Sequence, residues 1–172
     1  GMRIPDSEGW RVLGGVEMEI TRLVKGEVSI GYMEQTYDQF VGPSTTTGSW
    51  SYHAGLVWNA TPLMTVNLDA DRSVEDSTID TEGRIQDAFK LGLDYEIRRD
   101  LLFSPWVGFT INDYETQPIE DKRYEFGATL DYKMNRFLSL GTHYKYTYND
   151  IESSVLSDWD RHLVGVYAKA RF

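Results

Sequence analysis

Residues 138–148 read LSLGTHYKYTY, and their strict alternation decides the fold class. Leu140 and Tyr144 fall on one side of an extended chain, whereas His143 and Lys145 fall on the other. Successive side chains of a β-strand point to opposite faces of its sheet, so a period of two predicts a strand with one apolar and one polar face.

The same alternation recurs along the chain and predicts nine strands. They lie near residues 10–21, 26–37, 49–60, 63–73, 84–97, 101–112, 123–134, 137–148 and 160–172. No stretch has a helical period. We therefore predict an all-β fold, an antiparallel up-and-down meander that forms a transmembrane-type β-barrel of about 8–10 strands. Residues 10–172 are predicted to be one barrel domain. Residues 1–9 are read as an incoming segment headed by Gly1, a tag remnant, because a glycine before methionine is not a natural start.

The predicted connections alternate in length. Short turns fall near residues 22–25, 60–62, 98–100 and 135–136. Long polar connections fall near residues 38–48, 73–83, 113–122 and 149–159. Outer-membrane barrels have short periplasmic turns and longer extracellular loops, so this asymmetry favours a membrane barrel over a soluble meander.

Composition narrows the function classes. The 172 residues carry a formal net charge of -10, which argues against nucleic acid as a partner, since phosphate binding needs clustered Lys and Arg. The absence of cysteine excludes disulfides and thiolate metal sites. No run approaches the roughly 18 apolar residues of a spanning helix, but a barrel strand needs only about 9–11 residues that are apolar on one face.

The last predicted strand ends at Phe172. This end resembles the C-terminal signal that the barrel-assembly machinery reads in outer-membrane proteins, although Ala170 stands where an aromatic is common. A periplasmic C-terminus places every long loop outside and makes the first strand descend from the outside. Bacterial single-chain barrels normally have an even strand number, so nine strands predict at least one missing strand upstream. We therefore expect the C-terminal part of a larger barrel in the bacterial outer membrane, with its signal peptide absent from this sequence.

Two stretches resemble the β-barrel porin type 2 group. One is YKMNRFLSLGTHYKYTYNDIESS at residues 132–154, and the other is DRHLVGVYAKARF at residues 160–172. Short Asn-Arg turns, a Leu-Gly-x-x-Tyr strand and an Asp-Arg start to the last strand recur in that group. The resemblance implies an outer-membrane barrel that acts as a porin-like channel or as a component of surface-polysaccharide export. It supplies no catalytic or binding residues.

The polar face is rich in both charge signs, and its residues are our candidates for lining a lumen. They are Arg11, Glu17, Glu19, Asp69, Lys90, Asp94, Glu96, Glu125, Asp131, Lys133, His143, Lys145 and Lys169. Two interpretations stay open. The charges fill a narrow barrel with mutual salt bridges, or they form the wall of a watery pore and set its selectivity.

Nothing marks a catalytic or cofactor site. The three histidines, His53, His143 and His162, have no metal-ligand spacing, and no G-x-S-x-G motif is present. We therefore predict no enzyme, no cofactor and no metal. The acidic long loops either bind divalent cations that bridge lipopolysaccharide or are simply solvated.

The expected partners are outer-membrane lipid and lipopolysaccharide, the barrel-assembly machinery through the C-terminal strand, and other copies through open strand edges. Tyr and Trp near strand ends, including Trp159, are predicted to form a girdle at the membrane–water boundary. Asp87 breaks the apolar face of its strand and is placed near the outer end, where charge costs less. The alternative is a soluble lipocalin-like barrel with its apolar face inward around a lipophilic ligand.

Overall fold

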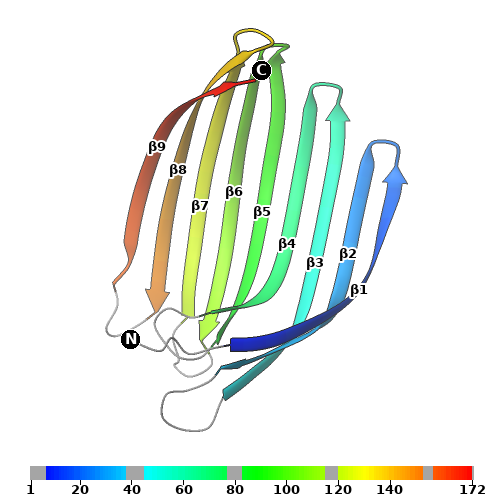
Figure 1. Cartoon of the computed structure of the whole chain (residues 1–172), viewed down its shortest axis with the longest axis vertical. Coiled ribbons are helices and arrows are strands. Elements are labelled where there is room, and N and C mark those ends of the chain that lie inside the picture. Colours follow the sequence, from blue (N-terminus) through cyan, green and yellow to red (C-terminus); the bar gives the residue numbers. More distant parts are fainter. Residues whose placement is uncertain (1–6, 38–44, 77–82, 115–119, 153–156, 172) are drawn as a thin grey trace.

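The computed structural model describes residues 7–37, 45–76, 83–114, 120–152 and 157–171. These residues form nine strands (Figure 1): β1 (Ser7–Thr21), β2 (Val24–Tyr37), β3 (Thr45–Thr61), β4 (Met64–Asp76), β5 (Gly83–Arg98), β6 (Leu101–Tyr114), β7 (Glu120–Lys133), β8 (Leu138–Glu152) and β9 (Trp159–Ala170). None of the described residues forms a helix of the length and apolar character needed to cross a membrane. Phe172, the expected assembly signal, lies outside the described residues.

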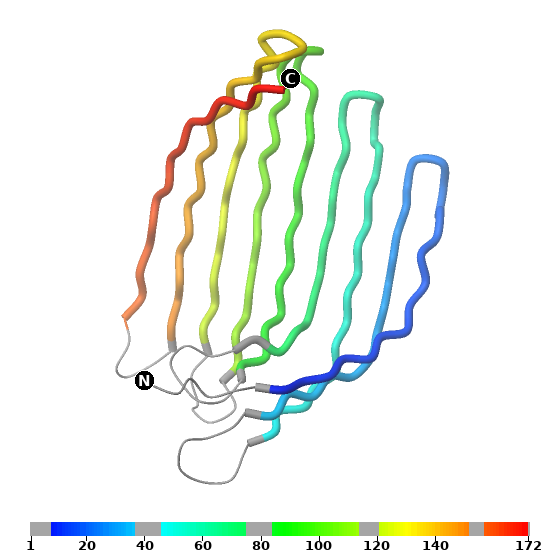
Figure 2. The backbone as a smooth tube through the Cα atoms, in the orientation of Figure 1, coloured from blue at the N-terminus to red at the C-terminus, as the bar shows by residue number. Residues whose placement is uncertain are grey.

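Each strand pairs antiparallel with the next, so the sheet order is β1 to β9 without a crossover. The predicted meander is thereby confirmed. The backbone trace in Figure 2 follows one curved sheet with no second layer. Among the described residues no pairing joins β1 to β9. Because the strands alternate in direction, the first and the ninth run the same way.

Several strands extend further than their alternation predicted, toward the long connections. β3 begins at Thr45 rather than near residue 49, and β8 ends at Glu152 rather than near residue 148. The ladder is built from backbone N–H and C=O groups, which pair whatever the side chain. Threonine hydroxyls also meet across the β2–β3 extension, where Thr36 and Thr46 lie 3.0 Å apart. Hydropathy alone therefore underestimated the strand lengths.

Side-chain oxygens hold the short turns. The Thr21 hydroxyl accepts hydrogen bonds from the backbone N–H groups of Leu23 and Val24, at 3.2 and 3.1 Å. The β7–β8 turn is held in the same way by a side-chain amide. Asn135 Oδ1 accepts hydrogen bonds from the backbone N–H groups of Phe137 and Leu138. In the β5–β6 turn, the hydrogen bond from the Arg98 guanidinium holds the pKa of the Asp100 carboxyl below its ordinary value. These contacts close the turns locally, before any longer-range packing.

The strand registers give the sheet one apolar and one polar face. The apolar face is open: Val166 on β9 is 83 % exposed. The polar face carries all the buried polar side chains of the described residues, and these are Thr47, Ser51, Asn112, Asp121, Thr147 and Asn149. In a sheet of one layer, a side chain is buried only by neighbours on its own face, and these crowd together on the concave side. The polar face is therefore the concave face of the sheet.

Candidate functional site

The candidate site is the polar face itself, and contacts between strands that are not neighbours show how strongly it curves. Arg11 on β1 donates to the Asp71 carboxylate on β4 at 3.3 Å, across both β2 and β3. Neighbouring strands lie about 4.8 Å apart, so these two side chains bridge roughly 14 Å of backbone. The Tyr167 hydroxyl on β9 likewise donates to Asp131 on β7 at 2.6 Å, over β8. Such reaches are possible because the sheet folds toward this face.

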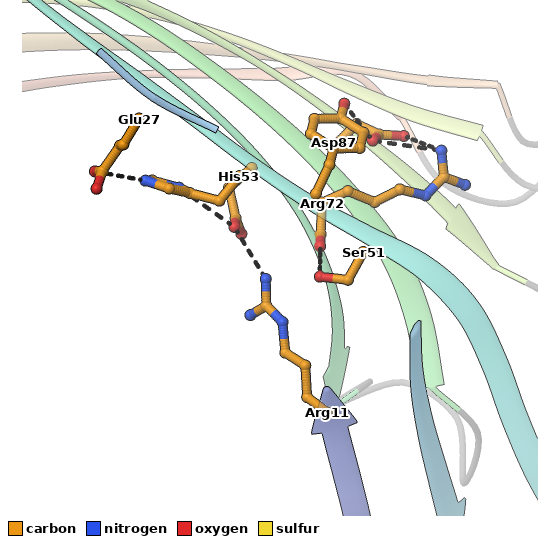
Figure 3. Close-up of polar contacts among 8 residues, drawn as sticks. Arg11, Glu27, Ser51, His53, Arg72 and Asp87 are labelled. Carbon is orange, nitrogen blue, oxygen red and sulfur yellow. Dashed lines mark hydrogen bonds and ion pairs between the residues drawn. The ribbon is translucent and has the colours of Figure 1, made fainter. Parts of the chain in front are cut away.

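One network joins the first four strands (Figure 3). The carboxylate of Asp71 that receives Arg11 also lies 3.8 Å from Nδ1 of His53, and Nε2 of His53 lies 3.1 Å from Glu27 Oε1. One residue from each of β1, β2, β3 and β4 takes part. His53 stands between two carboxylates, so this arc of the face is held together by charge and hydrogen bonding.

A second network joins β7, β8 and β9. Tyr167 reaches Asp131 by lying over Gly141, where an added Cβ would stand 2.3 Å from the phenol ring. Lys169 lies 3.9 Å from the same Asp131 carboxylate and 4.5 Å from the centre of the Tyr167 ring. The absence of a side chain at Gly141 is what lets the ring cross the strand.

A third group lies on β6, β7 and β8. Lys145 on β8 forms an ion pair with Glu125 on β7 at 2.6 Å. The ring of Trp106 on β6 lies over Gly127, where an added Cβ would stand 2.4 Å from the indole. Trp106 was not singled out from the sequence, because the alternation of residues 101–112 was not resolved into two faces. Its even position in β6, shared with Ser104, was the signal that could have found it.

All thirteen predicted candidates lie on the polar face by register: Arg11, Glu17, Glu19, Asp69, Lys90, Asp94, Glu96, Glu125, Asp131, Lys133, His143, Lys145 and Lys169. The structure does not gather them into one centre. Some enter the networks described above, and Glu19 pairs with Lys25 at 3.1 Å. Six form no ion pair and no side-chain hydrogen bond with any described residue, and these are Glu17, Asp69, Lys90, Glu96, Lys133 and His143, of which Lys90 and His143 contact an aromatic ring. Ion pairs thus join part of the face, and other charges on it have no partner among the described residues.

Charge is divided unevenly around the curve. On β1 to β4 the described polar face carries five carboxylates (Glu17, Glu19, Glu27, Asp69 and Asp71) and two bases (Arg11 and Lys25). On β5 to β9 the bases outnumber the acids, with Arg84, Lys90, Arg123, Lys133, Lys145, Arg161 and Lys169 against Asp94, Glu96, Asp121, Glu125 and Asp131. The face therefore has an acidic arc and a basic arc.

The described residues contain no group of three His, Asp or Glu side chains placed to hold a metal ion. The concave polar face also separates the two barrel types considered from the sequence. A lipocalin-like barrel would turn its apolar face inward, and here the apolar face is the convex, exposed one.

The family model described as "Putative beta-barrel porin 2" matches residues 3–172. The chain belongs to this family. The family places the chain among the porin-like β-barrels of the bacterial outer membrane. No curated protein matches the sequence.

Solved structures of outer-membrane proteins share the fold. The outer membrane channel DcaP of Acinetobacter baumannii matches with a TM-score of 0.62 at 15% identity, over 93% of this chain and 62% of that one. A loop-deletion mutant of OmpT, an outer membrane protein of Vibrio cholerae, matches with a TM-score of 0.61 at 12% identity, over 95% and 53%. CymD, a monoaromatic hydrocarbon channel, matches with a TM-score of 0.54 at 11% identity, over 91% and 50%. This porin-family chain thus spans between half and about three fifths of these structures.

The convex face of the porin carries aromatic clusters toward the long-connection ends of the strands. Trp10, Tyr32 and Trp50 form one chain of ring contacts, with centroids 5.9 and 6.0 Å apart. Phe109, Tyr124 and Tyr148 form another, at 5.0 and 6.3 Å. Trp159 does not join them, because its register opposite Asn149 puts it on the polar face. Its position near a strand end suggested the girdle, but parity decides the face.

Asp87 fills the gap between those two aromatic clusters, as part of an outward-facing ion pair. Arg72 Nη1 lies 3.2 Å from Asp87 Oδ2, and the Tyr52 hydroxyl donates to Asp87 Oδ1 at 2.9 Å (Figure 3). Only 15 % of the Asp87 side chain is exposed. The charge that broke the apolar pattern of β5 is thus compensated from β3 and β4.

Proposed function

We propose that the chain forms part of the wall of a water-filled channel in the outer membrane, with its polar face toward the lumen. The observation that carries this proposal is the concave face of mixed charge, opposite a convex face of exposed apolar side chains. Such an arrangement suits water on the inside and hydrocarbon on the outside. The charged side chains without partners on the polar face are free to meet passing ions.

The proposal requires the free edges of β1 and β9 to be paired. An unpaired backbone N–H or C=O group in hydrocarbon costs several kcal/mol, so open sheet edges do not face lipid. Since β1 and β9 run in the same direction, an odd number of further strands closes the barrel with antiparallel pairs throughout. The channel structures above, which are longer than this chain, are consistent with strands beyond the nine described.

The expected partners follow from the same arrangement. Outer-membrane lipid, including lipopolysaccharide, covers the apolar face in this proposal. The barrel-assembly machinery engages the C-terminal strand and Phe172. The edges of β1 and β9 are also where two copies would associate before closure.

Planar bilayers test the channel with the full-length protein. We expect ion conductance, and in a KCl gradient we expect Glu17→Gln to reduce cation preference, because Glu17 is an unpaired carboxylate of the polar face. The matched control is Glu34→Gln, which removes the same charge from the convex face. An unchanged reversal potential in the Glu17 variant would argue against a lumen on this side. A protein that inserts but conducts no ions would instead favour the other role that the family resemblance implies, in export of surface polysaccharide.

A further inference from the structure

Trp106 is a large ring set among glycines on the polar face. Its register partners are Gly92 on β5 and Gly127 on β7, and its indole lies over the second of these, where an added Cβ would stand 2.4 Å from the ring. Gly108, the next polar-face residue of β6, also borders the ring, with an added Cβ only 3.3 Å away. The backbone around Trp106 is therefore not covered by side chains at these three glycine positions. Trp106 itself is only half-buried, so part of the indole is open to solvent.

Two ammonium groups from different strands approach this indole. Lys90 Nζ on β5 lies 4.8 Å from the ring centre, and Lys145 Nζ on β8 lies 5.7 Å from it. A cation over an indole is attracted by the negative face of the ring. The pair is not equivalent, because Lys145 is already neutralised by Glu125 at 2.6 Å.

Lys90 keeps its charge uncompensated. In the register of β4 and β5 it stands opposite Asp69, yet the two form no ion pair within 4.0 Å, and Lys90 pairs with no other carboxylate of the described residues. Its ammonium turns toward the indole instead. The result is one unpaired positive charge beside a half-open aromatic ring, on the basic arc of the face.

We propose that Lys90 and Trp106 form a binding site for aromatic monocarboxylates that pass along this wall. This inference rests on the proposed function. A carboxylate complements the one unpaired ammonium, and a flat ring complements the indole by offset or edge-on contact. An aliphatic acid would gain nothing from the indole, and a neutral arene would leave the ammonium unpaired. A cation would be repelled by the uncompensated charge of Lys90.

The test measures benzoate against two probes that each lack one feature. Acetate keeps the carboxylate without the ring, and benzyl alcohol keeps the ring without the charge. Equilibrium dialysis of labelled probes against the full-length protein in detergent gives binding, and current block in planar bilayers gives the effect on permeation. We expect benzoate to bind and to block, and we expect acetate and benzyl alcohol to need concentrations about tenfold higher.

Variants locate the site. Lys90→Met and Trp106→Leu are each expected to weaken benzoate binding by about tenfold. Lys133→Met is the matched control, because it removes the same charge from the same face at an exposed lysine without an aromatic neighbour. Trp106→Phe keeps a ring and is expected to retain part of the binding if the leucine variant folds poorly.

Equal binding of benzoate and acetate would overturn the proposal. An equal loss of benzoate binding in the Lys90 and Lys133 variants would overturn it as well. Either result would mean that benzoate responds to the positive charge of the face in general and not to a site at Trp106. Failure of the channel is scored separately. Benzoate binding that depends on Lys90 and Trp106 in a protein without conductance would keep the site and reject the channel. Conductance that benzoate does not alter, with no benzoate bound in dialysis, would keep the channel and reject the site.

Discussion

At the scale of single residues, aromatic rings on the polar face pack over glycines of neighbouring strands. Trp106 lies over Gly127, and Tyr167 lies over Gly141. The ring covers backbone that the glycine leaves bare, which helps to offset the low strand propensity of glycine. The face therefore depends on small residues as much as on its charges.

Replacing Gly127 by alanine is expected to destabilise the barrel. The new Cβ would stand within 2.4 Å of the indole, so Trp106 must move, at a cost of about 1–3 kcal/mol. Urea-induced unfolding from lipid vesicles measures the free energy of unfolding. Gly14→Ala is the matched control, because a Cβ at Gly14 meets no atom within 4 Å, and its effect should stay within about 0.5 kcal/mol. Equal losses in the two variants would mean that the ring contact is unimportant.

The ion pair between Arg72 and Asp87 on the apolar face predicts that a double variant is more stable than one of its single variants. Asp87→Asn leaves the Arg72 charge without its partner on the apolar face, and we expect a loss of about 1–3 kcal/mol. The double variant Arg72→Gln with Asp87→Asn removes both charges and should recover most of that loss. The same unfolding measurement decides it. Additive losses in the double variant would show that the two charges are independent.

Each hairpin combines a turn held by a side chain with a ladder that continues past the apolar part of the strand. The pattern of residues predicts the turns because the bonds are local: Thr21 and Asn135 each reach backbone groups only two and three residues away. Strand length is decided differently, since β3 and β8 continue into polar sequence as long as a partner strand runs beside them. Turns are therefore local, and strand ends are set by pairing.

Asn135→Ala is expected to weaken the β7–β8 hairpin. Asn135 Oδ1 accepts from the N–H groups of Phe137 and Leu138 at 2.8 and 3.0 Å, and loss of these bonds should cost about 1 kcal/mol of unfolding free energy. Asn135→Asp keeps an acceptor oxygen and should stay close to the wild type. If the aspartate variant is as unstable as the alanine variant, the turn is not held by this oxygen.

The whole molecule is a single layer whose two faces meet different surroundings. Curvature brings Arg11 to Asp71 across two intervening strands and spreads the apolar side chains on the other side. The long connections all leave from one end of the sheet and the short turns from the other. From this asymmetry we expect an orientation in the membrane with the long connections outside.

Cysteine labelling tests that orientation without background, because the sequence contains no cysteine. In intact cells that express the full-length protein, a membrane-impermeant maleimide is expected to label Ser157→Cys, which lies at the long-connection end. It should label Arg136→Cys, in the β7–β8 turn, only after the outer membrane is permeabilised. The reverse order would invert the barrel. Equal labelling of both variants in intact cells would argue against a membrane location.

The sequence by itself determined the number of strands, their antiparallel order and the two faces. These properties follow from a period of two and from turn residues, which act over a few neighbouring positions. It also placed every candidate on the polar face, since parity within a strand needs no knowledge of its neighbours.

Only the tertiary structure decided which face is concave and which side chains meet. Asp87 is paired by Arg72 and Tyr52, and Lys90 turns from Asp69 to Trp106. Trp159 lies on the polar face, although its position near a strand end suggested the aromatic girdle. Such contacts depend on the register and curvature of strands far apart in the chain. Register and curvature are fixed by all the strand pairings together, so they cannot be predicted from the sequence of one strand.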